Sequence, residues 1–338
     1  MQRVTTSSLA CFRSCPRKYL HEYLLGRRRV TEGAPLAIGR FAHTLLEAWW
    51  SGGREAVLAT LTGAARDITP EDAAKVAAML HGYNPKLPDG RVARDNFKVA
   101  ALEQTFDGIK IVNPDTSQPM RTHCLAGKVD GLLLDAEGQK WVLEHKTTSD
   151  EIMGYGPFWQ RLSIDHQISY YMLATGAVGV LYDVLRKPEF RICQIPELDA
   201  TGARVVVDAT GVRVLKKDGA PRQTADTAKG YTLKSRAETP DEYQTRVVAE
   251  IEATPERYYQ FRSVVKTPAD ILEAQADLWA QAHMLADCER ANRWPRNSGA
   301  CRSFFGVCEY LGVCVGSEQI DDDTLFRTKA GQNEELAA

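Results

Sequence analysis

Residues 127–147, GKVDGLLLDAEGQKWVLEHKT, decide the fold of this chain. The turn-forming residues 135–138 (DAEG) separate two apolar runs, which predicts a β-hairpin. Because side chains alternate along a strand, Glu144 and Lys146 point the same way, and Asp130 on the partner strand can lie beside them. Two carboxylates that converge next to a lysine form a site for a hard divalent cation.

This arrangement favours phosphodiester hydrolysis. A divalent metal polarises the phosphoryl oxygen and lowers the pKa of a bound water, and a lysine stabilises the developing charge. An isolated Glu-x-Lys is more often an exposed cross-strand charge pair. Here the apolar run 141–143 precedes Glu144, which indicates an interior strand in which charges need a function.

Helices and strands alternate in the rest of the chain. Helical spacing of apolar residues predicts helices over 5–25, 37–50, 54–64, 70–82, 161–175, 240–254 and 268–293. β-type composition predicts strands over 97–106, 121–134, 140–147, 177–186 and 257–266. The polar segment 187–240 is interpreted as a partly mobile insertion and the acidic tail 317–338 as disordered. We find no internal repeat.

The motifs GKVDGLLL and WVLEHKT resemble the catalytic motifs of the PD-(D/E)XK nuclease superfamily, specifically its RecB-type branch. The resemblance implies an α/β, restriction-endonuclease-like core with a central mixed sheet flanked by helices. It also implies that Asp130, Glu144 and Lys146 are catalytic and that the metal, held by both carboxylates, is Mg²⁺ or Mn²⁺. By the same resemblance, His145 gives its main-chain carbonyl to the metal.

Two further motifs of that branch have counterparts here. Residues 39–43 (GRFAH) match a Gly-x-x-x-His element, which implies that His43 is a metal ligand. Gln167 and Tyr171 match a Gln-x-x-x-Tyr helix and lie one turn apart on one face. The resemblance implies that they position a DNA phosphate or the active-site water, with helix packing as the alternative for Tyr171. Glu103 lies where many relatives carry a glutamate, and its function stays open.

The cysteines form a second pattern. Residues 15–19 (CPRKY) resemble the N-terminal element of RecB-type nucleases that hold an iron–sulfur cluster. With Cys15, the later Cys301, Cys308 and Cys314 supply the four thiolates of a [4Fe–4S] cluster. Zinc is the alternative cofactor, although zinc sites usually contain closer C-x2–4-C pairs; ordinary buried cysteines are another. Cys11 competes with Cys15 as a ligand, and three cysteines are expected to be buried small hydrophobic residues: Cys124, Cys193 and Cys288.

Charge is unevenly distributed in this chain of 338 residues with a net charge of −2. Eight Lys/Arg residues oppose Glu22 and Glu32 within residues 1–40: Arg3, Arg13, Arg17, Lys18, Arg27, Arg28, Arg29 and Arg40. Such a segment is expected either to contact DNA phosphates or to be a solvated face. No apolar run is long enough to span a membrane and no signal pattern is found, so we expect a cytoplasmic protein.

We expect an iron–sulfur subdomain from residues 1–30 and 288–316, and a nuclease core over 31–287 that carries the insertion. The resemblance extends to CRISPR-associated, AddB-type and phage exonucleases, and implies a DNA exonuclease that prefers single-stranded ends, in phage or bacterial recombination or repair. One alternative is a protospacer-processing nuclease of CRISPR adaptation. Another is a catalytically inactive DNA-binding scaffold with a structural cluster. The partner, a recombinase, helicase or integrase, stays open.

Overall fold

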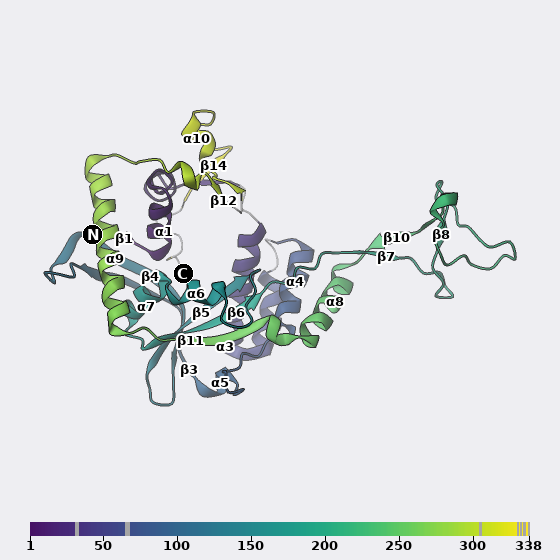
Figure 1. Cartoon of the computed structure of the whole chain (residues 1–338), viewed down its shortest axis with the longest axis horizontal. Helices are drawn as coiled ribbons and strands as arrows, with labels where there is room; N and C mark the ends of the chain where they lie inside the picture. Colours follow the sequence, from purple (N-terminus) through teal and green to yellow (C-terminus); the bar gives the residue numbers. More distant parts are fainter. Residues whose placement is uncertain are drawn as a thin grey trace.

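The expected hairpin forms the centre of a mixed sheet in this computed structural model, which describes residues 1–30, 34–64, 68–303, 306–329, 331, 333 and 336 (Figure 1). Strands β4 (Pro119–Leu134) and β5 (Lys140–Thr148) are antiparallel and join at the predicted turn, where Leu134 faces Lys140. Within the described residues the sheet has six strands in the order β1–β4–β5–β6–β11, and β3 also pairs with β4. The added strands are β1 (Gln2–Val4), β3 (Lys98–Val112), β6 (Gly179–Arg186) and β11 (Tyr259–Val264). Because β1 runs parallel to β4 and β5 parallel to β6, the sheet is mixed, as expected.

Helices cover both faces of this sheet. One face packs against α3 (Ala34–Ala64), α4 (Pro70–His81) and α8 (Pro240–Ala253), and the other against α6 (Pro157–Ser163) and α7 (His166–Thr175). Neighbouring residues of β5 alternate between the two cores: Leu143 joins the first and Val142 the second. A third core is formed mainly by α1 (Thr6–Ser14), α2 (Pro16–Tyr19), η1 (Leu20–Leu24) and α9 (Pro268–Ala291).

Several helix boundaries differ from the expected ones. The predicted helix 161–175 is two helices, because the side chain of Asp165 accepts a hydrogen bond from the Gln167 N–H and caps α7. The predicted helix 5–25 is interrupted at Cys15, which is extended (φ −161°) before Pro16 begins α2. The expected break after residue 50 is confirmed, since Gly53 has a non-helical φ of 72° inside α3.

The insertion 187–240 forms a projecting β-arm, which we define as residues 194–237 (Figure 1). Its base is the antiparallel pair of β7 (Gln194–Pro196) and β10 (Ser235–Ala237). Farther out lie β8 (Val206–Val207), the 3₁₀ turn η3 (Thr227–Lys229) and β9 (Thr232–Leu233).

The β-arm contains a repeated turn, which corrects our expectation that the chain has no repeat. The sequence DATG occurs at 199–202 and again at 208–211. In both copies the glycine N–H donates to the aspartate carbonyl, and in both the glycine has a positive φ, as hairpin turns of this kind require. A third turn, at 216–219, has the same backbone bonding.

The acidic tail is ordered in the part that the structure describes, so the expected disorder is wrong for residues 317–329. Strand β14 (Phe326–Thr328) pairs with β2 (Arg27–Arg29), and the Phe326 side chain is fully buried. Burial of this aromatic residue offsets the conformational entropy that the segment loses on ordering. The segment is therefore ordered although its acidic composition predicted disorder. The rest of the tail lies largely outside the described residues.

Short elements complete the described chain: α5 (Ala93–Asn96), η4 (Pro255–Arg257), η5 (Ser298–Ala300), β12 (Arg302–Ser303), β13 (Gly306–Val307) and α10 (Leu311–Val315). In the part of the chain that the structure describes, no helix is both long and apolar enough to cross a membrane.

Candidate active site and cysteine cavity

The two predicted catalytic carboxylates meet where β4 and β5 leave their paired register. The last pair of the hairpin is Gly131 with Leu143, so Asp130 and Glu144 occupy the next positions on the two strands. The Asp130 carboxylate accepts a hydrogen bond of 2.8 Å from the His145 N–H. Glu144 is only 4% exposed, and its Oε2 atom has no hydrogen-bond partner. A buried carboxylate oxygen without a partner is unusual and marks a position that a cation can occupy.

Lys146 and Gln167 complete the environment of Glu144. The Lys146 Nζ donates to Glu144 Oε1 over 2.6 Å and to Gln167 Oε1 over 2.8 Å. The Gln167 Nε2 in turn donates to Glu144 Oε1 and to the Tyr171 hydroxyl, both over 2.9 Å. Asp165 caps α7 two residues before Gln167 and accepts a hydrogen bond from the Gln167 N–H, so the start of this helix sets the position of Gln167.

Histidines approach the same carboxylates from the opposite face of the sheet. His43, on α3, has its Nδ1 atom 3.5 Å from Asp130 Oδ2. Its ring meets that of His145 edge to face, at 5.8 Å between centroids. His145 is 2% exposed, and its Nδ1 lies 2.8 Å from Asp183 Oδ2, which also accepts a hydrogen bond from the Tyr83 hydroxyl.

The site keeps one carboxylate ionised and disfavours ionisation of the other. Burial raises the pKa of Glu144 to about 7, against the opposing effect of Lys146. Burial opposes ionisation of Asp130 as well, yet its pKa is lowered, because His43 and the His145 N–H stabilise the carboxylate. Burial alone would lower the pKa of Lys146, but the facing Glu144 carboxylate raises it and keeps the ammonium charged.

The residues present fit a divalent cation. Asp130, Glu144 and His43 offer oxygen and imidazole ligands, and the unpartnered Glu144 oxygen is directed into the buried site. In this conformation Lys146 holds the other oxygen of Glu144. Among the described residues, no group of three or more His, Cys, Asp or Glu side chains is arranged to hold a metal ion.

Sequence reasoning missed two groups beside the site. Asp183 and Tyr83 belong to no motif, and the contact between them joins positions 100 residues apart. Glu103, which we left without a function, has a positive φ of 49° and pairs with Lys128. Glu47 lies near enough for Glu103 and Asp130 to contribute to a raised pKa, after burial as the first cause.

All four predicted cluster cysteines line one cavity of about 340 Å³. Cys15 comes from the start of α2, and the other three come from the C-terminal part of the chain: Cys301, Cys308 and Cys314. All eight cysteines are free thiols in the structure. Of the three cysteines expected to be buried, Cys124 is buried, Cys288 is half-buried and Cys193 is exposed, so the expectation is wrong for Cys193.

Cys11 does not line this cavity. Its thiol lies 3.7 Å from Glu22 Oε2, and burial, followed by the charge of that glutamate, raises the pKa of the thiol well above its ordinary range. A thiol held protonated is a poor ligand. The structure therefore favours Cys15 over Cys11.

Three cations of the basic N-terminal segment pair with carboxylates of the C-terminal part of the chain. Arg27 pairs with Asp323 over 2.7 Å, and Arg29 contacts both oxygens of Glu318 over 3.0 and 2.8 Å. Lys18 pairs with Glu309 over 3.1 Å. These three cations are paired with carboxylates of the same chain, and the sequence left open whether the segment contacts phosphates or is a solvated face.

Comparison with known proteins agrees with the geometry of the carboxylates and lysine. The family profile of the PD-(D/E)XK nuclease superfamily matches residues 3–315, so this chain belongs to that superfamily. No curated protein matches significantly. Among solved structures, the crystal structure of SSO0001 is similar at 14% identity and a TM-score of 0.24, over 55% of this chain and 63% of that chain.

Proposed function

We propose that this chain is a Mg²⁺- or Mn²⁺-dependent deoxyribonuclease that degrades DNA from single-stranded ends, in phage or bacterial recombination or repair. Membership of a nuclease superfamily supports hydrolysis of nucleic acid. The observation that carries the proposal is the buried carboxylate of Glu144, which keeps one oxygen free beside Asp130, Lys146 and His43. A purely structural ion pair has no need of a free, buried oxygen. This argues against an inactive scaffold.

In the proposed reaction, Asp130, Glu144 and His43 would hold the metal, together with the main-chain carbonyl of His145. The bound metal would supply Lewis-acid activation of the phosphate and of water. The Lys146 ammonium, held charged by Glu144, stabilises negative charge that develops on the phosphate or orients the attacking water. Gln167 fixes Lys146 and Glu144 relative to each other, and Tyr171 in turn fixes Gln167.

We further propose that Cys15, Cys301, Cys308 and Cys314 hold a [4Fe–4S] cluster. Their common cavity supports a shared cofactor. Four thiolates are what such a cluster needs, whereas zinc sites usually contain closer C-x2–4-C pairs than the spacing of these cysteines. Because Cys15 and Cys301 lie at opposite ends of the chain, the cluster would join the termini as a structural link.

Two measurements test the proposed function. The protein, purified without oxygen, is incubated with end-labelled linear single-stranded DNA, linear duplex and circular single-stranded DNA, with Mg²⁺ or Mn²⁺. We expect rapid loss of the linear single strand and survival of the circle. Degradation of the circle at the same rate would mean an endonuclease.

Metal analysis should give about four irons per chain, lost in Cys15→Ser but kept in Cys11→Ser. One zinc and no iron would exclude the cluster and leave the nuclease proposal standing.

A further inference from the structure

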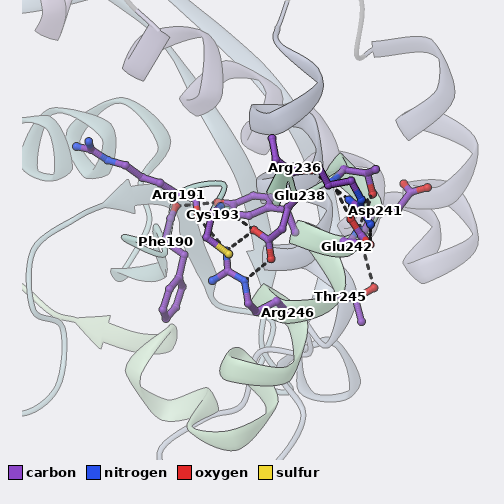
Figure 2. A network of polar contacts seen from close by, with 12 residues as sticks. Phe190, Arg191, Cys193, Arg236, Glu238, Asp241, Glu242, Thr245 and Arg246 are labelled. Carbon is purple, nitrogen blue, oxygen red and sulfur yellow. Dashed lines mark hydrogen bonds and ion pairs between the residues drawn. The ribbon is translucent and has the colours of Figure 1, made fainter. Parts of the chain in front are cut away.

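The base of the β-arm is firmly attached to the core (Figure 2). Glu238, which is 6% exposed, contacts Arg246 of α8 through two hydrogen bonds of 2.7 Å and accepts a third from the Cys193 N–H. Arg246 also donates to the Arg191 carbonyl over 2.9 Å. Cys193 comes one residue before β7 and Glu238 one residue after β10, so the chain is held next to both strands at the base of the arm.

A second ion pair strengthens the same junction. Arg236 of β10 donates to both oxygens of Glu242, with two contacts of 2.6 Å (Figure 2). Glu242 also closes the capping box at the start of α8, with Thr239 as the cap. Bidentate arginine–carboxylate pairs fix direction as well as distance. Two such pairs therefore hold the base of the arm against α8.

The β-arm is basic, whereas the rest of the chain is acidic. Residues 194–237 hold eight Lys/Arg against five Asp/Glu, a net charge of +3, so the remainder of this chain of net charge −2 carries −5. The carboxylates of the arm are used internally: Asp199 and Asp208 each accept bonds from turn N–H groups, and Asp218 accepts one from the Ala220 N–H.

Three exposed cations of the arm form no ion pair within the described part of the chain. Arg204, Lys216 and Lys217 have no carboxylate partner among the described residues, in contrast to Arg213, which pairs with Asp199. Lys216 and Lys217 stand on the tight turn 216–219. Exposed cations that have no carboxylate partner, on a segment that projects from the core, are suited to contact the phosphates of a polyanion.

We propose that the β-arm binds the DNA backbone of the substrate at a distance from the active site, on the duplex that follows a single-stranded end. A two-stranded β-ribbon is narrow enough to enter the major groove of a duplex. The inference rests on the proposed function for its substrate, but it is tested by binding and does not need catalysis. The arm thereby determines how firmly the enzyme holds long substrates, while the core determines the chemistry.

The test compares two triple variants of equal charge change in the full-length, anaerobically purified protein. The arm variant carries Arg204→Glu, Lys216→Glu and Lys217→Glu. The control carries Arg54→Glu, Lys98→Glu and Lys140→Glu, at exposed positions outside the β-arm. Binding to a duplex with a single-stranded tail is measured between about 50 and 200 mM salt, a range in which phosphate contacts weaken strongly.

The arm variant should bind the tailed duplex more weakly than the control, with a log–log salt slope smaller by about three, one unit per lost phosphate contact. Cleavage of a short single strand should not change in either variant. If the two variants bind tailed duplex equally, the proposal is wrong, and the exposed Leu198, Val212 and Leu215 become the contacts of a protein partner instead. Failure of every variant and of the wild type to cleave DNA would overturn the proposed function alone.

A truncated protein provides a second measurement in case the triple variant misfolds. Pro196 and Ser235 are direct partners across the base of the arm, so an Asn-Gly turn can replace residues 197–234. The anchor formed by Glu238 and Arg246 is untouched. This variant should lose the same affinity for tailed duplex and keep cleavage of short single strands; full retention of duplex affinity would also overturn the proposal.

Discussion

The active-site hairpin and the β-arm use a carboxylate group in opposite ways. In the hairpin, Glu144 is buried and keeps one oxygen without any partner, beside a lysine and a second carboxylate. In the arm, Asp208 is placed on a turn, and one of its oxygens accepts bonds from the Thr210 hydroxyl and from two backbone N–H groups. A carboxylate that accepts several bonds from its own turn stabilises the local fold, whereas a buried carboxylate oxygen without a partner is available for chemistry.

The largest expected effect distinguishes these two carboxylates. Glu144→Gln removes the charge that would hold the metal, and DNA cleavage should fall by about 100- to 1000-fold, the order of loss seen when a charge-stabilising group is removed. Asp208→Asn, the matched control, should cleave like the wild type. Thermal unfolding and cleavage rates measured on both proteins check the comparison. Turnover near that of the wild type in Glu144→Gln would remove Glu144 from the catalytic residues.

The second effect concerns the imidazole beside Asp130. His43→Ala should lower cleavage by about 10- to 100-fold, as when the surroundings of a metal are weakened, and added Mn²⁺ should restore part of the loss. His283→Ala serves as the control, because His283 is exposed on α9 and pairs only with Asp287 in the described structure. Metal titrations of cleavage check this. An unchanged metal requirement in His43→Ala would mean that His43 is not a ligand.

A smaller effect is expected from the residue that connects α7 to the hairpin. Gln167→Ala leaves the Lys146–Glu144 contact in place but removes one partner from each. We expect cleavage to fall by roughly tenfold, within the range for groups that orient metal ligands, with little change in substrate affinity. Gln167→Glu keeps an acceptor for Lys146 and should retain more activity. A positioning role for Gln167 predicts a lower kcat with little change in KM. A structural role predicts instead that both variants are less stable to thermal unfolding.

How much of each region could be predicted depends on how local its determinants are. The hairpin was predictable because its turn, its alternation and its Glu-x-Lys spacing lie within 21 residues, and the structure confirms its register. The break before α7 was missed, although Asp165 is a recognisable cap. The β-arm was interpreted as mobile because its polar composition outweighed the repeated DATG turns, which were visible in the sequence.

Contacts between distant segments could not be predicted from local patterns. Nothing near Asp183 indicates that Tyr83 and His145 will meet it in the core. The pairing of β14 with β2 was hidden for a related reason. An acidic tail predicts disorder by composition, yet the strand pairing itself, the ion pairs to Arg27 and Arg29 and the burial of Phe326 stabilise it in the folded chain. Such information depends on three-dimensional packing, and a single sequence does not display it.

The smallest effect concerns the pH dependence of the β-arm. Bonds from the Thr210 hydroxyl and neighbouring N–H groups lower the pKa of Asp208 in the folded protein. Stabilisation from a lowered pKa is present above the ordinary aspartate pKa of about 3.9 and is lost as the pH falls through the lowered value. The turn should therefore loosen in acid. Amide-exchange protection at Thr210 and Val212, corrected for the intrinsic pH effect, should decrease below about pH 4.

Asp208→Asn provides the control, because its amide oxygen can still accept the turn bonds but does not titrate in this range. Protection in this variant should be nearly independent of pH at these two amides, while the other DATG turn, with Asp199 intact, keeps its acid response. An equal loss of protection in both proteins would show that acid acts elsewhere in the arm. The hydrogen bonds to the Asp208 carboxylate would then not be what stabilises this turn, and the contrast with Glu144 would lose its physical basis.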